Sequence, residues 1–332
     1  MAPPRPAACA ASVTRPRDVS RGAASSAASA GATRRCAPAL GPGSGERYRP
    51  GWRVALATSA EIPAGDEDFP ALIDALRAHG VEAEPAVWDG AVDWQAFDLV
   101  VLRSTWDYAE RREAFLDWAR SLPRVLNPVP VLEWNTDKRL YLADLEAAGV
   151  PTIPTAFVAP GERLAPPPGP FVVKPAVSAG GRSSARFGPG ERDAAATLLA
   201  RIHAEGRTAM VQPDLGDVEE TALVYVDGVY SHALRRRVPL PAANERDVFY
   251  LDEQLAPGEA TDAQRVVAER ALACAPGPLL YARVDLAGDA VLELEVTEPS
   301  LYLGFGDGVV CRFAAAISAA VAGRKPWDTL TS

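Results

Sequence analysis

The sequence YARVDLAGDAVLELEVTEPS, residues 281–300, decides the fold. It covers most of two runs, at 279–286 and 290–297, in which apolar residues are interleaved with polar ones, a pattern typical of β-strands. Gly288-Asp289 lies between the two runs and favours a tight turn. The stretch therefore predicts an antiparallel β-hairpin.

Four charged side chains gather on this hairpin. Side chains alternate between the two faces of a strand, so Arg283 and Asp285 share one face, and Glu293 and Glu295 share a face of the next strand. Clustered carboxylates repel one another unless a cation compensates them, and sets of oxygen ligands suit Mg²⁺, which also binds phosphate oxygens. The alternative is a solvated acidic sheet face. The apolar residues between the acids indicate a covered hairpin and favour the metal site.

A second motif, upstream of the hairpin, has the features of a phosphate-binding loop. The predicted strand at 171–174 ends in Lys174 and leads into PAVSAGGRSS, residues 175–184. Small residues let backbone N–H groups approach phosphate oxygens, and the lysine supplies a mobile positive charge. No Gly-Lys-Ser/Thr ends the loop, so it is not a Walker A motif. By itself the loop also fits a flexible surface hairpin.

The segment that begins near residue 52 predicts an open α/β domain. We expect strands at 54–58, 81–88 and 97–103 and helices at 69–79 and 109–120. Ligands of such domains bind beyond the carboxyl ends of the strands, which is where the loop RSTWDY at 103–108 would lie. The alternative is a polar turn with Trp106 packed into the core.

Composition excludes several classes of protein. The chain has 332 residues and a net charge of −9, which argues against a general nucleic-acid binder. No apolar run reaches the about 18 residues of a membrane-spanning helix or forms the apolar core of a secretory signal, so we expect a cytoplasmic protein without a membrane or nucleic-acid partner.

Residues 1–50 differ in composition from the rest of the chain. They contain eight arginines and two acidic residues, so they carry a charge of +6 and the remainder carries −15. We expect this Ala/Pro/Arg/Ser-rich tail to be disordered, because it has too few large apolar residues to form a core. A transit peptide would have a similar composition.

The motifs follow one another in the order found in the ATP-grasp superfamily of ATP-dependent carboxylate–amine ligases, which this chain resembles over residues 52–321. In chain order they are Lys138 on a helix, Lys174 before the small-residue loop, MVQPDL at 210–215, Glu220-Thr221, and the R-x-D and E-x-E of the hairpin. The hairpin spacing resembles the glutathione-synthetase branch, which has Asn where this chain has Glu295. The phrases RSTWDY, WNTDK, VVKPAVSAG, SHALRR, YARVDL and LELEVTEPSL are similar to the group that includes the cycloserine-forming O-ureido-serine cyclo-ligase.

The resemblance implies a role for each matching residue. ATP would be bound by Lys138, Lys174, Ser178, Gly180, Gly181, Ser183, Gln212, Leu215 and Glu220. Mg²⁺ would be held by Asp285, Glu293 and Glu295, and the acceptor substrate would be bound by Arg103, Ser104, Thr105, Asp107 and Ser300. Arg283 would stabilise charge on the transferring phosphoryl group. In the run Arg235-Arg236-Arg237, alternation puts the first and third on one face, and we expect Arg235 to face the nucleotide.

The fold class implied is α/β, with an N-terminal Rossmann-like domain followed by two α+β ATP-grasp subdomains. The expected division is a tail at 1–50, a pre-ATP-grasp domain at 51–134, subdomain A with the glycine-rich loop at 135–205, subdomain B with the metal site at 206–323, and a tail at 324–332.

The activity implied is that of a ligase. It would use ATP with Mg²⁺ or Mn²⁺ to phosphorylate a small amino-acid-like substrate, and an amine nitrogen would then form a C–N bond or close a ring, as in O-ureido-D-serine cyclo-ligase. An intermolecular ligase of the glutathione-synthetase or D-Ala-D-Ala-ligase type stays open as an alternative. So do a nucleotide-binding protein without ligase activity and a homo-oligomeric state.

Overall fold

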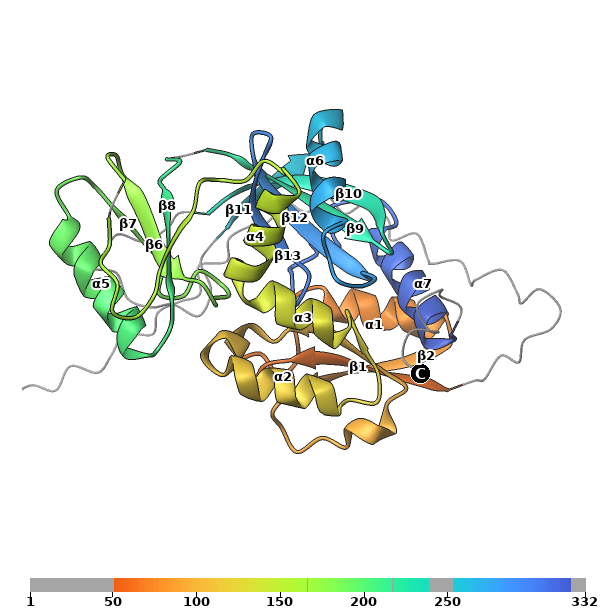
Figure 1. The fold of residues 1–332 in the computed structure, drawn as a ribbon. Coiled ribbons are helices and arrows are strands. Elements are labelled where there is room, and N and C mark those ends of the chain that lie inside the picture. The colour runs from red at the N-terminus through yellow and green to blue at the C-terminus, as the bar shows by residue number, and fades with distance from the viewer. Residues whose placement is uncertain (1–50, 166, 217, 239–252, 324–332) are drawn as a thin grey trace, which may run out of the picture. The chain divides into compact units, whose positions relative to one another are not determined.

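A computed structural model describes residues 51–165, 167–216, 218–238 and 253–323. Within them the chain forms three β-sheets with strand orders β2-β1-β3-β4, β5-β8-β6-β7 and β11-β10-β9-β12-β13 (Figure 1). The tails expected at 1–50 and 324–332 lie outside the described residues. None of the helices that are described is long and apolar enough to cross a bilayer.

The first sheet is the predicted open α/β layer. Its elements are β1 (Trp52–Thr58), α1 (Phe69–Ala78), β2 (Val81–Val87), β3 (Leu99–Ser104), α2 (Arg112–Ser121) and β4 (Val125–Leu126), and all its strand pairs are parallel. Because β1 side chains alternate, Val54 and Leu56 pack in the cluster that contains α1, whereas Ala55 and Ala57 pack with α2. Helices therefore cover both faces of this sheet.

Two helices connect the first sheet to the second. They are α3 (Val129–Thr136) and α4 (Lys138–Ala147). Asp137 separates them in an extended conformation (φ −112°, ψ 105°), and its carboxylate accepts a hydrogen bond from the Arg139 N–H at 3.0 Å. Asp137 is thus the N-cap of α4, and Lys138 becomes the first residue of that helix.

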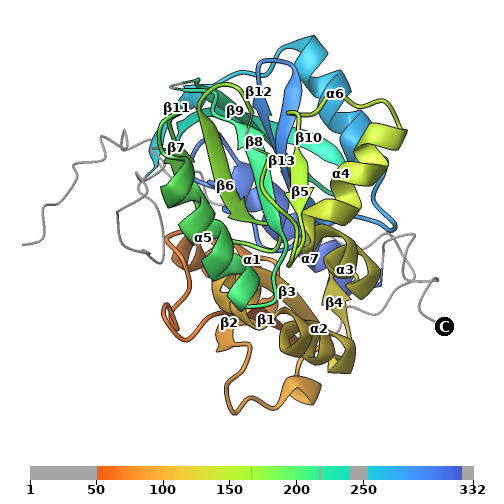
Figure 2. The same cartoon turned by 60° about the vertical axis from the view of Figure 1, so that its left-hand side comes forward.

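The second sheet carries the small-residue loop. Its elements are β5 (Ala156–Val158), β6 (Phe171–Pro175), β7 (Ala185–Phe187), α5 (Arg192–Ala204) and β8 (Ala209–Pro213), with α5 packed beside β6 (Figure 2). Lys174 is paired with Met210 and Val172 with Gln212, so Lys174 and Gln212 project from the same face. Because β8 belongs to this sheet, the sheet continues beyond the subdomain boundary expected at 205/206, as far as Pro213. Sequence order alone could not show that the strand after α5 returns to pair with β6.

The third sheet contains the hairpin that decided the fold. Its elements are β9 (Glu220–Val226), β10 (Val229–Arg237), β11 (Gln254–Gly258), α6 (Asp262–Leu272), β12 (Tyr281–Ala287) and β13 (Ala290–Glu295), followed by α7 (Val309–Val321). Arg283 is paired with Glu295, and Asp285 with Glu293. Directly opposite residues share a face, so the predicted hairpin and its charged patch are confirmed.

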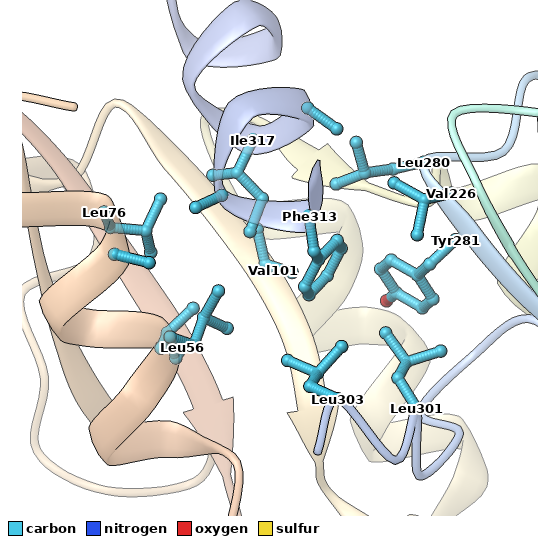
Figure 3. Packing of buried hydrophobic residues seen from close by; sticks show 14 of the residues in the cluster. Leu56, Leu76, Val101, Val226, Leu280, Tyr281, Leu301, Leu303, Phe313 and Ile317 are labelled. Carbon is cyan, nitrogen blue, oxygen red and sulfur yellow. The ribbon is translucent and has the colours of Figure 1, made fainter. Parts of the chain in front are cut away.

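A hydrophobic cluster ties the third sheet to the first. Leu76 of α1 and Val101 of β3 belong to the same cluster as Phe313 and Ile317 of α7 (Figure 3). The Phe313 ring meets Tyr281 of β12 edge-on, with ring centroids 5.9 Å apart. The start of β12, two residues before Arg283, is therefore anchored in a buried core.

Candidate functional site

A cavity of about 480 Å³ brings most of the predicted residues together. The predicted residues that line it are Lys138, Lys174, Ser178, Gly180, Gly181, Gln212, Leu215, Glu220, Arg283, Glu293, Glu295 and Ser300. They come from β6 and β8 of the second sheet, from the third sheet, from α4 and from the loops that follow β6, β8 and β13. Segments far apart in the sequence thus converge on one pocket.

Three carboxylates lie where the sequence predicted a metal site. Ligand oxygens of Asp285, Glu293 and Glu295 all lie within 4.8 Å of one another. Asp285 is fully buried and pairs with Arg283 Nε at 2.9 Å and with Arg236 Nη2 at 3.2 Å. Two arginines thus neutralise the deepest carboxylate and fix its orientation.

The electrostatics of the other two carboxylates fit a cation. Burial raises the pKa of Glu295 to about 7, with the Arg283 charge opposing and the neighbouring carboxylates adding to the shift. Burial also acts on Glu293, but the Lys138 and Lys174 charges hold its pKa well below the usual range. Crowded oxygen donors that resist ionising together are a suitable ligand set for Mg²⁺, which would compensate their charge.

Both motif lysines line the cavity. Lys138 Nζ donates to the Ser178 carbonyl at 3.0 Å and pairs with Glu293 at 3.1 Å. Burial would lower the pKa of Lys138, but Glu293 raises it above the usual value. Burial lowers the pKa of Lys174, which also lines the cavity. Both ammonium groups are positioned to meet an anionic ligand.

The small-residue loop bends over this region. Gly180 and Gly181 have φ values of +62° and +75°, which glycine adopts without strain. Both line the cavity, as does Ser178, whereas Ser183 (φ +54°) is not among the lining residues.

Gln212 and Glu220, which were also predicted to bind ATP, line the cavity. Gln212 Nε2 donates to Thr155 Oγ1 at 2.9 Å, which leaves its carbonyl oxygen as a free acceptor for an amino group. Glu220 accepts a hydrogen bond from Arg236 Nε at 3.0 Å, and burial raises its pKa.

The prediction that Arg235 faces the nucleotide is wrong. Its side chain is 54% exposed and pairs with Glu219, whereas Arg236 is buried and lines the cavity. The β10–β9 register shifts between Tyr230 and His232. Such a bulge reverses which face each later residue occupies, and the sequence alone does not reveal it.

The loop after β3 supports the cavity more than it lines it. Arg103, Ser104, Thr105 and Asp107 are buried but lie outside the lining, where Trp106 and Tyr108 appear instead. Residues 106–110 form a short 3₁₀ helix, so the alternation of a strand does not apply there. Further lining residues that we did not predict include Asn135, Arg236, Glu253 and Glu298; Asn135 and Glu298 lie inside the WNTDK and LELEVTEPSL motifs.

Comparison with known proteins identifies the family. The model of the N-terminal domain of D-cycloserine synthetase DcsG matches residues 54–127. The cycloserine biosynthesis protein DcsG of Streptomyces lavendulae is 39% identical over 293 residues, which cover 80% of this chain and 97% of that protein. This chain belongs to the DcsG family of ATP-grasp ligases.

Solved structures agree with this family assignment. The crystal structure of D-cycloserine synthetase DcsG matches with a TM-score of 0.70 and 37% identity, covering 81% of this chain and 99% of that one. D-alanine–D-alanine ligase from Bacillus anthracis, complexed with ATP, matches with a TM-score of 0.56 at 17% identity over 82% and 99% of the two chains, and shares the fold. The α/β ATP-grasp fold and the family resemblance predicted from the sequence are confirmed.

Proposed function

We propose that this DcsG-family ligase uses ATP and Mg²⁺ to close a ring by forming a C–N bond in a small amino-acid-like substrate, O-ureido-D-serine. The observation that carries the proposal is one cavity lined by Glu293, Glu295, two lysines and two buried arginines, with the buried Asp285 carboxylate within 4.8 Å of both glutamates. Mn²⁺ has similar ligand preferences and would be able to replace Mg²⁺.

The residues of the cavity divide the work of phosphoryl transfer. Lys138, Lys174 and the loop at 178–181 would orient the phosphates of ATP. The side-chain carbonyl oxygen of Gln212 would accept a hydrogen bond from the adenine amino group. Asp285, Glu293 and Glu295 would hold Mg²⁺, which neutralises charge on the phosphates. The guanidinium groups of Arg236 and Arg283 would stabilise the negative charge that develops on the transferred group.

The proposed reaction begins with phosphorylation of the substrate carboxylate. A substrate carboxylate oxygen bonds to the γ-phosphorus as the bond to ADP breaks, which gives an acyl phosphate. The ureido-oxy nitrogen then attacks the acyl carbon, loses its proton, and phosphate leaves with the bonding electron pair. Conversion to the unsubstituted ring also requires hydrolysis of the carbamoyl group, which consumes water and yields ammonia and carbon dioxide.

We also propose a functional division that follows the sheets. The segment 51–134 would form part of the acceptor pocket through Trp106, Tyr108 and the buried residues beneath them. The second and third sheets would bind the nucleotide between them, with the boundary after Pro213.

The decisive experiment supplies purified enzyme with ATP, Mg²⁺ and O-ureido-D-serine. We expect release of ADP and phosphate and a cyclic product, each dependent on all three components. Phosphate release that requires two separate substrates would instead identify an intermolecular ligase. Nucleotide binding by calorimetry without turnover of any member of a broad amino-acid panel would identify a binding protein.

A further inference from the structure

The loop that follows β13 is held by side chains along its backbone. Four successive carbonyls accept hydrogen bonds from side chains: Glu298 from Trp106 Nε1 (3.2 Å), Pro299 from Arg103 Nη1 (3.1 Å), Ser300 from Arg283 Nη1 (3.0 Å) and Leu301 from His232 Nε2 (3.0 Å). The Leu303 N–H donates to the Asp68 carboxylate at 3.2 Å. These donors and acceptors come from the first and third sheets and from the loop before α1, so the backbone from 298 to 303 has little freedom to move.

Glu298 extends its side chain from this fixed backbone to the cavity. The residue is only 7% exposed and lines the cavity beside Tyr108 and Ser300. Within the described residues, its carboxylate has neither a hydrogen-bond donor nor an ion-pair partner. Asp285, Glu293 and Glu295 each have a cationic partner, so Glu298 is unlike them.

A buried carboxyl group without a partner stays neutral unless the bound state supplies a positive charge that favours its ionised form. Burial raises the pKa of Glu298 well above its usual value, and the Glu295 carboxylate adds to the shift, while the Lys138 charge opposes it. Glu298 is also outside the group of three carboxylates that can share a metal ion. The positive charge that compensates Glu298 therefore comes from a bound group other than the metal ion.

An α-amino acid carries its ammonium nitrogen only about 2.5 Å from its carboxyl carbon. If the substrate carboxylate is activated beside Arg283, the protein group that binds the substrate ammonium must lie next to that arginine. Arg283 itself donates to the Ser300 carbonyl, two residues along the loop from Glu298. The geometry of the loop thus provides an anionic group close to where an α-ammonium group would lie.

We propose that the Glu298 carboxylate binds the α-ammonium group of the substrate and so makes the enzyme specific for amino acids with a free amino group. The inference rests on the proposed function, because it presumes that an amino-acid carboxylate is activated in this cavity. Nothing else is required of Glu298: it neither transfers a proton nor binds the metal.

The test compares two substrates in two proteins. Kinetics are measured for O-ureido-D-serine and for its des-amino analogue, in which hydrogen replaces the amino group, with the wild type and with Glu298→Gln. We expect the wild type to prefer the amino substrate by about 10- to 100-fold in kcat/KM, and the variant to lose most of that preference. KM for ATP should not change, and Glu298→Asp, which keeps the charge, should retain part of the preference.

Two controls separate recognition from a structural role. Glu133→Gln removes an exposed carboxylate of α3 that pairs with Arg120, and it should leave the preference intact. Glu298→Gln should unfold at the same temperature as the wild type or higher, because it replaces a buried carboxyl group that has no partner with a neutral side chain of the same shape.

Several outcomes would overturn the inference. One is a preference that persists in Glu298→Gln, and another is an equal loss for both substrates, which would indicate a structural or proton-transfer role. If the wild type converts other amino acids but not O-ureido-D-serine, the proposed function fails. The same comparison with D-serine and 3-hydroxypropanoate, by calorimetry in the presence of ADP and Mg²⁺, then decides the inference by itself.

Discussion

Asp285 is the residue on which the electrostatics of the site depend. It is fully buried between Arg236 and Arg283, which both contact its carboxylate. Replacing it with Ala would remove the buried carboxylate that both guanidinium groups share and leave them only their other partners, Glu220, Glu253 and Glu295. Breaking buried ion pairs commonly costs about 3–5 kcal/mol. Loss of activity in that variant would therefore not distinguish a lost metal ligand from a damaged fold.

Glu293 is a better position at which to test the metal site. Its side chain is 21% exposed and pairs with Lys138, so Glu293→Gln keeps the shape and leaves no pair of arginines uncompensated. We expect Mg²⁺-dependent ATP turnover to fall by about 100-fold or more, because one ligand of the trio is lost. Turnover is measured across a Mg²⁺ titration, with Glu219→Gln, a carboxylate outside the trio, as the matched control. Wild-type turnover in Glu293→Gln would place the metal elsewhere.

His232 gives the stability of the protein a pH dependence. Burial lowers its pKa from 6.5 to about 4, against the opposing effect of its bond to the Leu301 carbonyl. Between these values the unfolded chain binds a proton that the native protein does not, so stability rises with pH through this window and falls on acidification. Relative to His232→Gln, the wild type should lose up to about 3 kcal/mol of unfolding free energy between pH 7 and pH 4.

Urea unfolding of both proteins at several pH values measures this difference. Burial raises the pKa of Asp68 to about 6, so the native protein binds a proton there that the unfolded chain does not, and this makes stability fall as pH rises. Asp68 is present in both proteins, so comparing them isolates the contribution of His232. Parallel stability curves for the two proteins would contradict the prediction.

Among the elements, the hairpin of β12 and β13 was predictable because its signal is local. Alternation puts Arg283 and Asp285 on one face of their strand, and Gly288 marks the turn. The register shift between Asp285 and Leu286, which places Asp285 opposite Glu293 and Arg283 opposite Glu295, is not visible in the sequence. The face of Arg236 was not predictable, since it depends on a bulge in the β10–β9 ladder. The short strands β7 and β11 were missed for a related reason: three to five residues carry too little periodicity to be distinguished from a loop.

One buried side chain makes three hydrogen bonds between the end of the first sheet and the residues of this hairpin. Asn127, just after β4, donates from Nδ2 to the carbonyls of Tyr281 (3.0 Å) and Val296 (2.6 Å) and accepts from the Leu280 N–H (2.6 Å). Asn127→Leu would leave three buried backbone groups without partners. We expect it to lower the free energy of unfolding by about 3 kcal/mol or more.

Chemical denaturation measures that loss, and Thr197→Val on the exposed side of α5 serves as a surface control that should change stability little. A stability of Asn127→Leu close to that of the control would mean that the two sheets are held together without this residue.

At the scale of the whole molecule, the sequence was informative where composition was unusual. Only three lysines occur in the chain, and two of them, Lys138 and Lys174, line the cavity. What the sequence could not supply was the arrangement of the sheets around the cavity. Glu298 and Trp106 reach it only because the loop at 298–303 and the segment after β3, nearly 200 residues apart, are bonded to each other.

This arrangement predicts how a nucleotide affects the stability of the whole protein. A ligand that contacts α4, the second sheet and the third sheet at once binds the folded chain and not the unfolded one, so it stabilises the native state. At 100 times its Kd, a non-hydrolysable ATP analogue should add about 2.7 kcal/mol to the free energy of unfolding and raise Tm accordingly. The three carboxylates make this gain depend on Mg²⁺, because without a cation they repel the phosphates. Thermal unfolding with the analogue alone, with Mg²⁺ alone and with both measures the effect. Equal Tm values under all three conditions would show that the cavity is not a nucleotide site.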